Sequence, residues 1–405
     1  MVRQGAGKKT LVAFALVLAL SVLGACTNAP PARDATASEE PTPIPAPAPE
    51  APPTVSYVPF SDLRELGRVY HDEEKECAWF GFTSSGFEFS FSGKGKVEAT
   101  FLTDISLSEE FGAFIGVFID NNETASQTIL MDLPIKKVVL FECDKFSRAT
   151  IRIEKLSELK FSDAALLYLT TTGIGCEVKP TAPRDMLIEF IGDSITSGYG
   201  LLTNEMSGPF TTRAEDGSRT YSAITARHFG ADLRVVSYAG AGVFHSNTAG
   251  PTNDEVPLIG DIYLAGDIRR SDAPWDFPSQ QPADFIVINI GTNDGVKIDE
   301  NPELYGPEFG EAYFSFLGEV RALNPDAFII SALGPMAFTS EDYLFPAWQR
   351  FAREDKNTRY LRFDGIDIEE DGIGSAGHPT LATHEKMAAY LIRHIGMLRN
   401  AGSQI

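Results

Sequence analysis

The sequence predicts a doubly wound α/β layer, a parallel sheet of about five strands, over residues 184–405. The main observation is that short apolar strands alternate there with segments of helical composition. A second observation is the change of pattern near residue 183, since the preceding stretch from residue 55 contains only short strands and turns. We therefore expect an all-β domain, a jelly roll or sandwich, in front of the α/β domain.

The N-terminal segment, residues 1–25, has the pattern of a bacterial lipoprotein signal peptide. Basic residues precede an apolar run over residues 11–23, and the sequence Leu-Gly-Ala-Cys ends at Cys26. We expect Cys26 to be the lipidated N-terminus of an extracytoplasmic, lipid-anchored protein of the bacterial cell envelope, on either the inner or the outer membrane. An ordinary secretory signal with a coincidental cysteine is the alternative. The apolar run is short for a membrane span, so acyl chains would provide the anchor.

Residues 26–54 are rich in Pro and Ala, a composition that cannot bury a core, and we expect an extended tether. The formal net charge of the chain is -22, which argues against nucleic acid and anionic membrane surfaces as partners. Cys77, Cys143 and Cys176 remain after Cys26. An exported compartment permits one disulfide among them, and the pairing stays open.

Alternating side chains predict the β domain over residues 55–183. Phe87, Phe89 and Phe91 alternate with polar residues. Further strands are expected at Ala113–Ile119, Lys137–Phe141, Thr150–Ile153 and Ala165–Thr170. This spacing is typical of a jelly roll or sandwich. Trp79 and the phenylalanines would then pack in the core, with a sugar-stacking face as the alternative.

Five apolar runs predict the parallel strands of the α/β domain: Leu187–Ile191, Leu233–Ser237, Phe285–Ile290, Phe328–Leu333 and Tyr360–Phe363. Helices are expected between and after them, including Arg219–His228, Glu311–Leu323 and Leu381–Leu398. Right-handed crossovers between parallel strands then bring all five carboxyl ends to one edge of the sheet. Ligands of open α/β sheets bind at that edge.

The first of these carboxyl ends is the sequence Gly192-Asp193-Ser194. An apolar strand that turns directly into a helix lifts Ser194 to the edge of the sheet, beside N–H groups that can receive negative charge. The alternative is that Asp193 or Ser194 merely caps the helix.

Together these features resemble the SGNH (GDSL-type) hydrolases. The resemblance rests on Gly-Asp-Ser-Ile after the first strand, a glycine after the second, Gly-x-Asn-Asp after the third and a late histidine, and it covers residues 186–405. The details most resemble carbohydrate esterase family 2, and they are Trp275-Asp276-Phe277, Gln281-Pro282-Ala283-Asp284, Gly334-Pro335-Met336, His378-Pro379-Thr380 and Arg152-Ile153-Glu154-Lys155. The resemblance implies a flavodoxin-like sheet and a serine esterase.

The resemblance also implies roles for individual residues. Ser194 would be the nucleophile, and its own N–H, the N–H of Gly242 and the amide of Asn293 would form the oxyanion hole. Gly240 competes with Gly242 for the second place. The structural alternatives are a tight turn with positive φ at Gly242 and a loop-capping amide at Asn293.

His378 is the expected base among six histidines, because it follows a glycine-rich loop. Pro379 suits the first position of the last helix, whose positive end would disfavour an imidazolium ion. SGNH hydrolases usually have an Asp three residues before this histidine, but here the residue is Ser375. We therefore predict a Ser-His dyad with a backbone carbonyl on the imidazole, as the resemblance to family 2 allows.

Three acids, Asp367, Glu370 and Asp371, could instead reach back to the imidazole. His245 would line the substrate cleft or lie on the surface, and Trp275 would be a platform for a sugar ring or a packing residue of a lid. No spacing of His or Cys matches a metal site, and no cofactor is expected.

The expected function is removal of O-acetyl groups from a polysaccharide, xylan-like or mannan-like, by a lipid-anchored esterase. A lysophospholipase or a peptidoglycan O-acetylesterase is the alternative within the enzyme class. A surface lipoprotein that binds glycans without turnover is the alternative outside it.

Overall fold

The structure, a computed structural model, describes residues 52–103, 110–248 and 255–402. The predicted signal peptide, Cys26 and nearly all of the tether therefore lie outside the described residues. None of the helices in those three ranges is long and apolar enough to cross a membrane.

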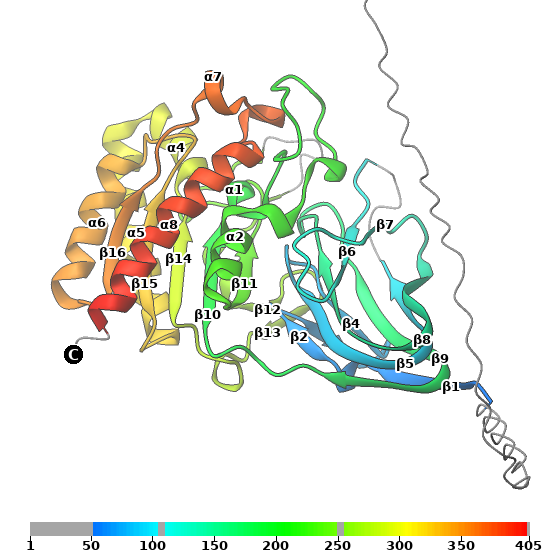
Figure 1. The fold of residues 1–405 in the computed structure, drawn as a ribbon. Helices are drawn as coiled ribbons and strands as arrows, with labels where there is room; N and C mark the ends of the chain where they lie inside the picture. The colour runs from blue at the N-terminus through cyan, green and yellow to red at the C-terminus, as the bar shows by residue number, and fades with distance from the viewer. Residues whose placement is uncertain (1–51, 104–109, 249–254, 403–405) are drawn as a thin grey trace, which may run out of the picture. The chain divides into compact units, whose positions relative to one another are not determined.

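A parallel sheet of five strands forms the centre of the α/β domain, as predicted (Figure 1). The strand order is β11-β10-β14-β15-β16. The strands are β10 (Leu187–Gly192), β11 (Asp232–Ser237), β14 (Phe285–Asn289), β15 (Phe328–Leu333) and β16 (Thr358–Arg362). Gly192 pairs with Ser237 on one side and with Asn289 on the other, so three carboxyl ends meet at one level of the sheet.

Helices bury both faces of this sheet, which explains why its strands are continuous apolar runs. On one face, Ile188 and Phe190 pack with side chains of α2 (Tyr221–Phe229) and α8 (Leu381–Gly402). On the other face, Ile191 packs with α3 (Ile259–Leu264), α5 (Pro302–Leu323) and α6 (Glu341–Glu354). Successive residues of β10 thus supply two separate cores.

The predicted helix at Glu311–Leu323 begins earlier in the structure, at Pro302. Asn301 caps this helix through its side chain, and a proline suits the first helical turn because that turn needs no N–H donor. Pro307 and two glycines obscure the helical pattern of this first part in the sequence. Short helices follow the strands at α1 (Ser194–Ser197), α4 (Thr292–Glu300) and α7 (Ile368–Asp371).

The N-terminal domain is β-rich, and its strands are hydrogen-bonded into one nine-stranded antiparallel sheet. Its strands are β1 (Thr54–Pro59), β2 (Arg64–Leu66), β3 (Tyr70–Asp72), β4 (Cys77–Trp79), β5 (Gly86–Leu102), β6 (Phe114–Ile119), β7 (Gln127–Leu130), β8 (Ile135–Lys155) and β9 (Ala165–Pro180). Phe87, Phe89 and Phe91 of β5 are buried in its core, as is Trp79 of β4, as the packing interpretation expected. The jelly-roll topology stays a prediction.

Two of the predicted strands in this domain were wrong as separate elements. Lys137–Phe141 and Thr150–Ile153 are parts of the single strand β8, which is 21 residues long. The middle of β8 lies largely outside the core, so its exposed and polar residues read as a turn in the sequence. Cys143 and Cys176 of this domain are half-buried free thiols, and Cys77 is buried.

A segment between β8 and β9, residues 156–163, extends from the β domain into the α/β domain, and we call it the arm. Leu159 packs into the same apolar cluster as Ile191 of β10. Phe161 packs against Tyr199 and Phe210 of the α/β domain. The arm is therefore a buried part of the α/β domain.

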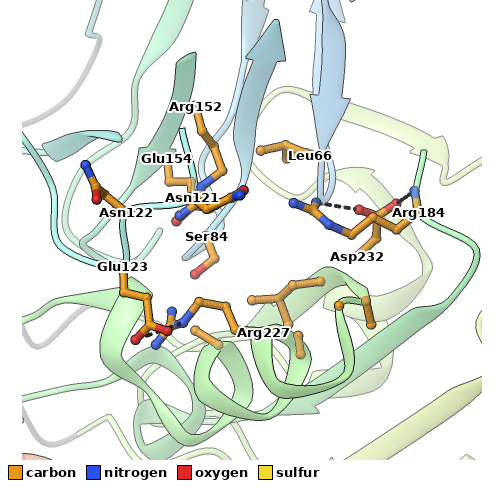
Figure 2. Close-up of a pocket in the computed structure, with 15 residues that line it drawn as sticks. Leu66, Ser84, Asn121, Asn122, Glu123, Arg152, Glu154, Arg184, Arg227 and Asp232 are labelled. Carbon is orange, nitrogen blue, oxygen red and sulfur yellow. Dashed lines mark hydrogen bonds and ion pairs between the residues drawn. The ribbon is translucent and has the colours of Figure 1, made fainter. Parts of the chain in front are cut away.

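An ion pair between Arg64 of the β domain and Asp232 of the α/β domain joins the two domains along a second contact. Figure 2 shows a pocket of about 320 Å³ lined by Arg152 and Glu154 of the β domain and by Arg184 and Asp232 of the α/β domain. Arg152 Nε lies 2.7 Å from Glu154 Oε1, and Arg184 Nη1 lies 3.1 Å from Asp232 Oδ1. Asp232 also pairs with Arg64 of β2. Since each of these charged side chains has a partner within the protein, we infer that the pocket belongs to the contact between the two domains.

Candidate active site

Ser194 lies at the turn from β10 into α1, at the carboxyl edge of the sheet. Asp193 is the N-cap of α1, and its Oδ1 accepts a hydrogen bond from the N–H of Ile195 at 3.0 Å. The capping role expected as an alternative therefore belongs to Asp193. Ser194 is the first helical residue, with 8% of its surface exposed. Its hydroxyl group is thus free of capping and lies where a helix N-terminus favours negative charge.

His378 faces Ser194 from the loop before α8. Its Nε2 lies 2.8 Å from Ser194 Oγ, and its Nδ1 lies 3.1 Å from the backbone carbonyl oxygen of Ser375. A neutral imidazole that donates Nδ1–H to this carbonyl presents the Nε2 lone pair to the serine hydroxyl. A backbone carbonyl thus occupies the place of the Asp carboxylate in a triad.

Burial lowers the pKa of His378 to about 4, against the raising effect of hydrogen bonds to the backbone of Ser375 and Ala376. The neutral ring needed by a general base is therefore favoured at neutral pH. The expected role of Pro379 was wrong, because α8 begins at Leu381 rather than at Pro379. Burial of the imidazole, rather than the positive end of a helix, therefore favours the neutral form of His378.

The three acids expected as alternatives bind other groups. Asp367 caps α7 by accepting the N–H groups of residues 369 and 370. Glu370 and Asp371 each pair with Lys386 of α8, at 2.8 and 2.7 Å. Their interactions thus stabilise α7 and its contact with α8.

The side chain of Asn293 contacts the residues that precede Ser194 and Gly242, so it links two of the expected oxyanion donors to the turn at Ser194. The side-chain amide of Asn293 donates to the carbonyl oxygen of Ala241 at 2.9 Å and lies 3.2 Å from Asp193 Oδ2. The N–H of Gly242 donates to Ser246 Oγ at 3.2 Å. A substrate oxygen that binds here therefore has to replace these protein acceptors.

Gly240 and Gly242, which both follow β11, are required to be glycine for different structural reasons. Gly240 has a φ of +89°, so the tight turn belongs to it and not to Gly242. At Gly242 an added Cβ would lie 2.1 Å from the carbonyl oxygen of His245 and 2.8 Å from both carboxylate oxygens of Asp294. Close packing therefore requires glycine at this position.

Asp294 holds this segment, residues 238–247, which we call the Gly242 loop. Its carboxylate accepts the N–H groups of Val243, Phe244 and His245 at 3.1, 2.7 and 2.9 Å. Burial raises the pKa of Asp294, while these three donors oppose that effect. No role was expected for Asp294 from the sequence, although its place in the Gly-x-Asn-Asp motif was a signal.

The aromatic ring of Tyr199 packs against the catalytic candidate His378, a contact that sequence reasoning missed. The two ring centroids are 4.3 Å apart, and Tyr199 also stacks on Phe210 at 3.6 Å. The N–H of Tyr199 donates to the carbonyl oxygen of Ser194 at 3.0 Å. Tyr199 therefore contacts both members of the candidate dyad.

The two weaker candidates lie in different surroundings. His245 is a half-buried residue of the Gly242 loop, so its contact with substrate stays a prediction. Trp275 follows β13 (Ser271–Pro274), and the guanidinium group of Arg68 lies 5.0 Å from the centroid of its ring. This contact favours packing over a sugar platform for Trp275. Within the described residues, no three His, Cys, Asp or Glu side chains form a group that could hold a metal ion.

Residues 190–385 match the model of the GDSL-like Lipase/Acylhydrolase family. Residues 190–385 thus form a domain of the GDSL-type (SGNH) hydrolase family. The chain is 32% identical over 228 residues to a cellulase/esterase, CelE, of Acetivibrio thermocellus, and the match covers 55% of this chain and 27% of that protein. It is 24% identical over 333 residues to an acetylxylan esterase/glucomannan deacetylase of Cellvibrio japonicus, covering 81% of this chain and 87% of the relative.

Solved structures of carbohydrate esterase family 2 share the fold of both domains. A family 2 esterase from Clostridium thermocellum, in complex with cellohexaose, has a TM-score of 0.71 at 24% identity, covering 84% of this chain and 99% of that one. An acetyl xylan esterase from the rumen bacterium Butyrivibrio proteoclasticus has a TM-score of 0.73 at 20% identity, covering 87% and 99%. These likenesses confirm an SGNH fold preceded by a β-rich domain.

Proposed function

We propose that this chain is a serine esterase that removes O-acetyl groups from a polysaccharide. The observation that supports this most directly is the Ser194 hydroxyl 2.8 Å from Nε2 of a histidine whose Nδ1 meets a backbone carbonyl. The relative from Cellvibrio japonicus, named as an acetylxylan esterase/glucomannan deacetylase, supports the substrate class, a xylan-like or mannan-like chain.

The reaction proceeds through an acetyl-enzyme. Ser194 Oγ attacks the ester carbonyl carbon while His378 Nε2 takes the hydroxyl proton. The N–H groups of Ser194 and Gly242 and the amide of Asn293 stabilise the oxyanion. His378 then gives its proton to the sugar oxygen as the C–O bond breaks. A water molecule, deprotonated by His378, attacks the acetyl-enzyme, and acetate and free Ser194 are released.

Hydrolysis of a chromogenic acetyl ester beside a long-chain ester tests the reaction class, and acetylated xylan and glucomannan then test the substrate. We expect the acetyl ester to be preferred and Ser194→Ala to lower its turnover by several orders of magnitude. The matched control is Ser279→Ala, at an exposed residue, with circular dichroism to verify folding. More than about a tenth of wild-type turnover in Ser194→Ala would place the nucleophile elsewhere.

The same assays separate the alternatives. Preference for the long-chain ester would favour a lysophospholipase, and release of acetate from peptidoglycan alone would favour a peptidoglycan O-acetylesterase. Glycan binding without any turnover would favour a non-catalytic surface protein.

We also propose that the protein is anchored outside the bacterial cell membrane by acyl chains on Cys26. The basic and apolar pattern before Cys26 supports this location. Cys26→Ser should release the protein from the membrane fraction or leave an unprocessed precursor. Normal processing with an unchanged, detergent-dependent distribution would contradict the lipid anchor.

A further inference from the structure

The arm of the β domain contacts the backbone just before the candidate oxyanion glycine. Glu158 Oε2 accepts a hydrogen bond from the N–H of Ala239 at 2.8 Å. Ala239 lies in the Gly242 loop, between the end of β11 and Gly242. A side chain of the β domain thus holds one end of this loop, while Asp294 of the α/β domain holds the other.

The carboxyl group of Glu158 meets that of Glu215. Glu215 Oε2 accepts the N–H of Glu158 at 2.9 Å, and the two carboxyl groups interact electrostatically. Both residues are buried, at 0% and 3% exposure. Oε1 of each residue is buried without a hydrogen-bond partner among the described residues.

One proton shared between the two carboxyl groups would account for two observations: the close approach of two buried acids and the lack of a hydrogen-bond partner, in the described part of the chain, at each Oε1 atom. Two buried carboxylates in contact repel each other strongly, and a buried acceptor without a donor costs about 1–3 kcal/mol. A carboxylic acid that donates to the neighbouring carboxylate removes the repulsion and gives the unpaired oxygens a shared hydrogen.

We propose that Glu158 and Glu215 share this proton and that the pair positions the Gly242 loop for catalysis. Glu158 is a positioning residue, because it touches Ala239 and not the reacting atoms. The proposal rests on the esterase function proposed above. It gives the β domain a part in the chemistry through its arm, separate from any contact with the polysaccharide.

The charged groups around the pair come from four other parts of the chain. Lys155 of β8 donates from Nζ to the carbonyl oxygens of Ser157 and Glu158 at 2.7 and 2.8 Å. The remaining groups that interact electrostatically with the pair or with Lys155 are Lys160 and Asp163 of the arm, Arg269 after β12 (Ala265–Asp267), Asp193 before α1 and the phenol of Tyr199. Lys155 thus supplies positive charge beside the single negative charge of the pair.

The pair should lose its shared proton in alkaline solution, above the pH at which Glu158 ionises. Burial raises the pKa of Glu158 to about 7 and raises that of Glu215 well above its usual range. Burial also lowers the pKa of Lys155 to about 8, so the compensating positive charge is lost in alkaline solution too. Repulsion between two carboxylates would then displace Glu158 from Ala239.

The pH dependence of kcat and KM for an acetyl ester tests the proposal. We expect wild-type kcat to fall on the alkaline side with KM nearly constant, and Glu158→Gln and Glu215→Gln to weaken this fall. An amide donates the same hydrogen bond without titrating. Glu158→Ala, which cannot hold Ala239, should lower kcat by about a hundredfold at every pH. Glu158→Gln should restore most of that loss, and Glu311→Gln on the surface is the matched control.

Two readouts do not depend on turnover. The infrared difference spectrum between wild type and Glu158→Gln should contain the carbonyl band of a protonated carboxylic acid. This band of the wild type should weaken as the pH rises through about 7, where Glu158 ionises, and disappear at the higher pH where Glu215 also ionises. A raised carboxyl pKa adds stability at low pH that is lost as the pH rises through it, so the wild-type melting temperature should fall over this range more than that of Glu158→Gln.

An alkaline fall in kcat that stays the same in both Gln variants would overturn the proposal, as would a wild-type spectrum without the acid band. If the wild type hydrolyses no ester, the proposed function fails, while the spectrum and the melting curves still decide whether the proton is shared. If a Gln variant does not fold, the pH titration of the wild-type band decides alone.

Discussion

Replacement of the acids near His378 distinguishes a dyad from a triad with unusual spacing. The three substitutions are Asp367→Asn, Glu370→Gln and Asp371→Asn, each made alone. Asp371 is the sharpest case, because its side chain is only 4% exposed. Each change removes a charge and keeps the size of the side chain.

The structure predicts small effects. Asp367 accepts two N–H groups at the start of α7, a cap that Asn can also provide. Glu370 and Asp371 pair with Lys386, whose side chain is 51% exposed, and an ion pair with an exposed partner contributes about 0–1 kcal/mol. We expect kcat/KM to change by less than about tenfold, or about 1.4 kcal/mol. In a serine protease triad, the Asp→Asn change costs about 10⁴ in kcat because it favours the wrong imidazole tautomer.

Hydrolysis of a chromogenic acetyl ester measures kcat/KM, and the two expectations differ by about three decades. Circular dichroism and a melting curve verify that each variant is folded. A thousandfold loss in a folded variant would refute the dyad and identify the acid that orients His378.

Three further predictions concern the pH profile, the Gly242 loop and the arm. The low pKa of His378, about 4, keeps the base neutral in mild acid, so kcat/KM should fall only as the pH drops through about 4. An acid limb near the ordinary histidine pKa, with the protein still folded, would contradict this. Gly242→Ala should lower kcat by about a hundredfold, since its Cβ would lie 2.1 Å from a carbonyl oxygen, and near wild-type turnover would contradict the packing argument. Leu159→Ala should lower the free energy of unfolding by about 2–5 kcal/mol in urea titrations. The exposed Leu304→Ala is its control, and equal effects would contradict a buried arm.

The α/β domain was predictable because its sheet is covered on both faces. Largely apolar runs marked all five parallel strands, whereas their order in the sheet could be expected only from the resemblance to SGNH hydrolases. The β domain was less predictable, since β8 passes out of the core at its middle and loses the alternation that marks a strand. The arm could not be predicted, because a turn between two strands carries no periodic pattern.

At the candidate site, sequence motifs identified the expected catalytic residues but not the neighbouring residues that hold them in position. Ser194, Gly242, Asn293 and His378 belong to short sequence patterns, and the structure brings the first and last of them to 2.8 Å. The resemblance to family 2 implied a backbone carbonyl on the imidazole but did not identify Ser375, since every residue has a backbone carbonyl. Contacts between residues far apart in the sequence, such as Tyr199 with His378 or Glu158 with Ala239, depend on the three-dimensional packing of the chain. They leave no recognisable pattern in the local sequence.

The arm also limits how these two domains can be exchanged between proteins. Leu159 belongs to the main core of the α/β domain, and Phe161 to the aromatic group beside His378. A chimaera that joins this α/β domain to an unrelated β domain would therefore lack part of its own interior, even with an intact catalytic dyad. Recombination between relatives should preserve activity only when residues 156–163 are inherited together with the α/β domain.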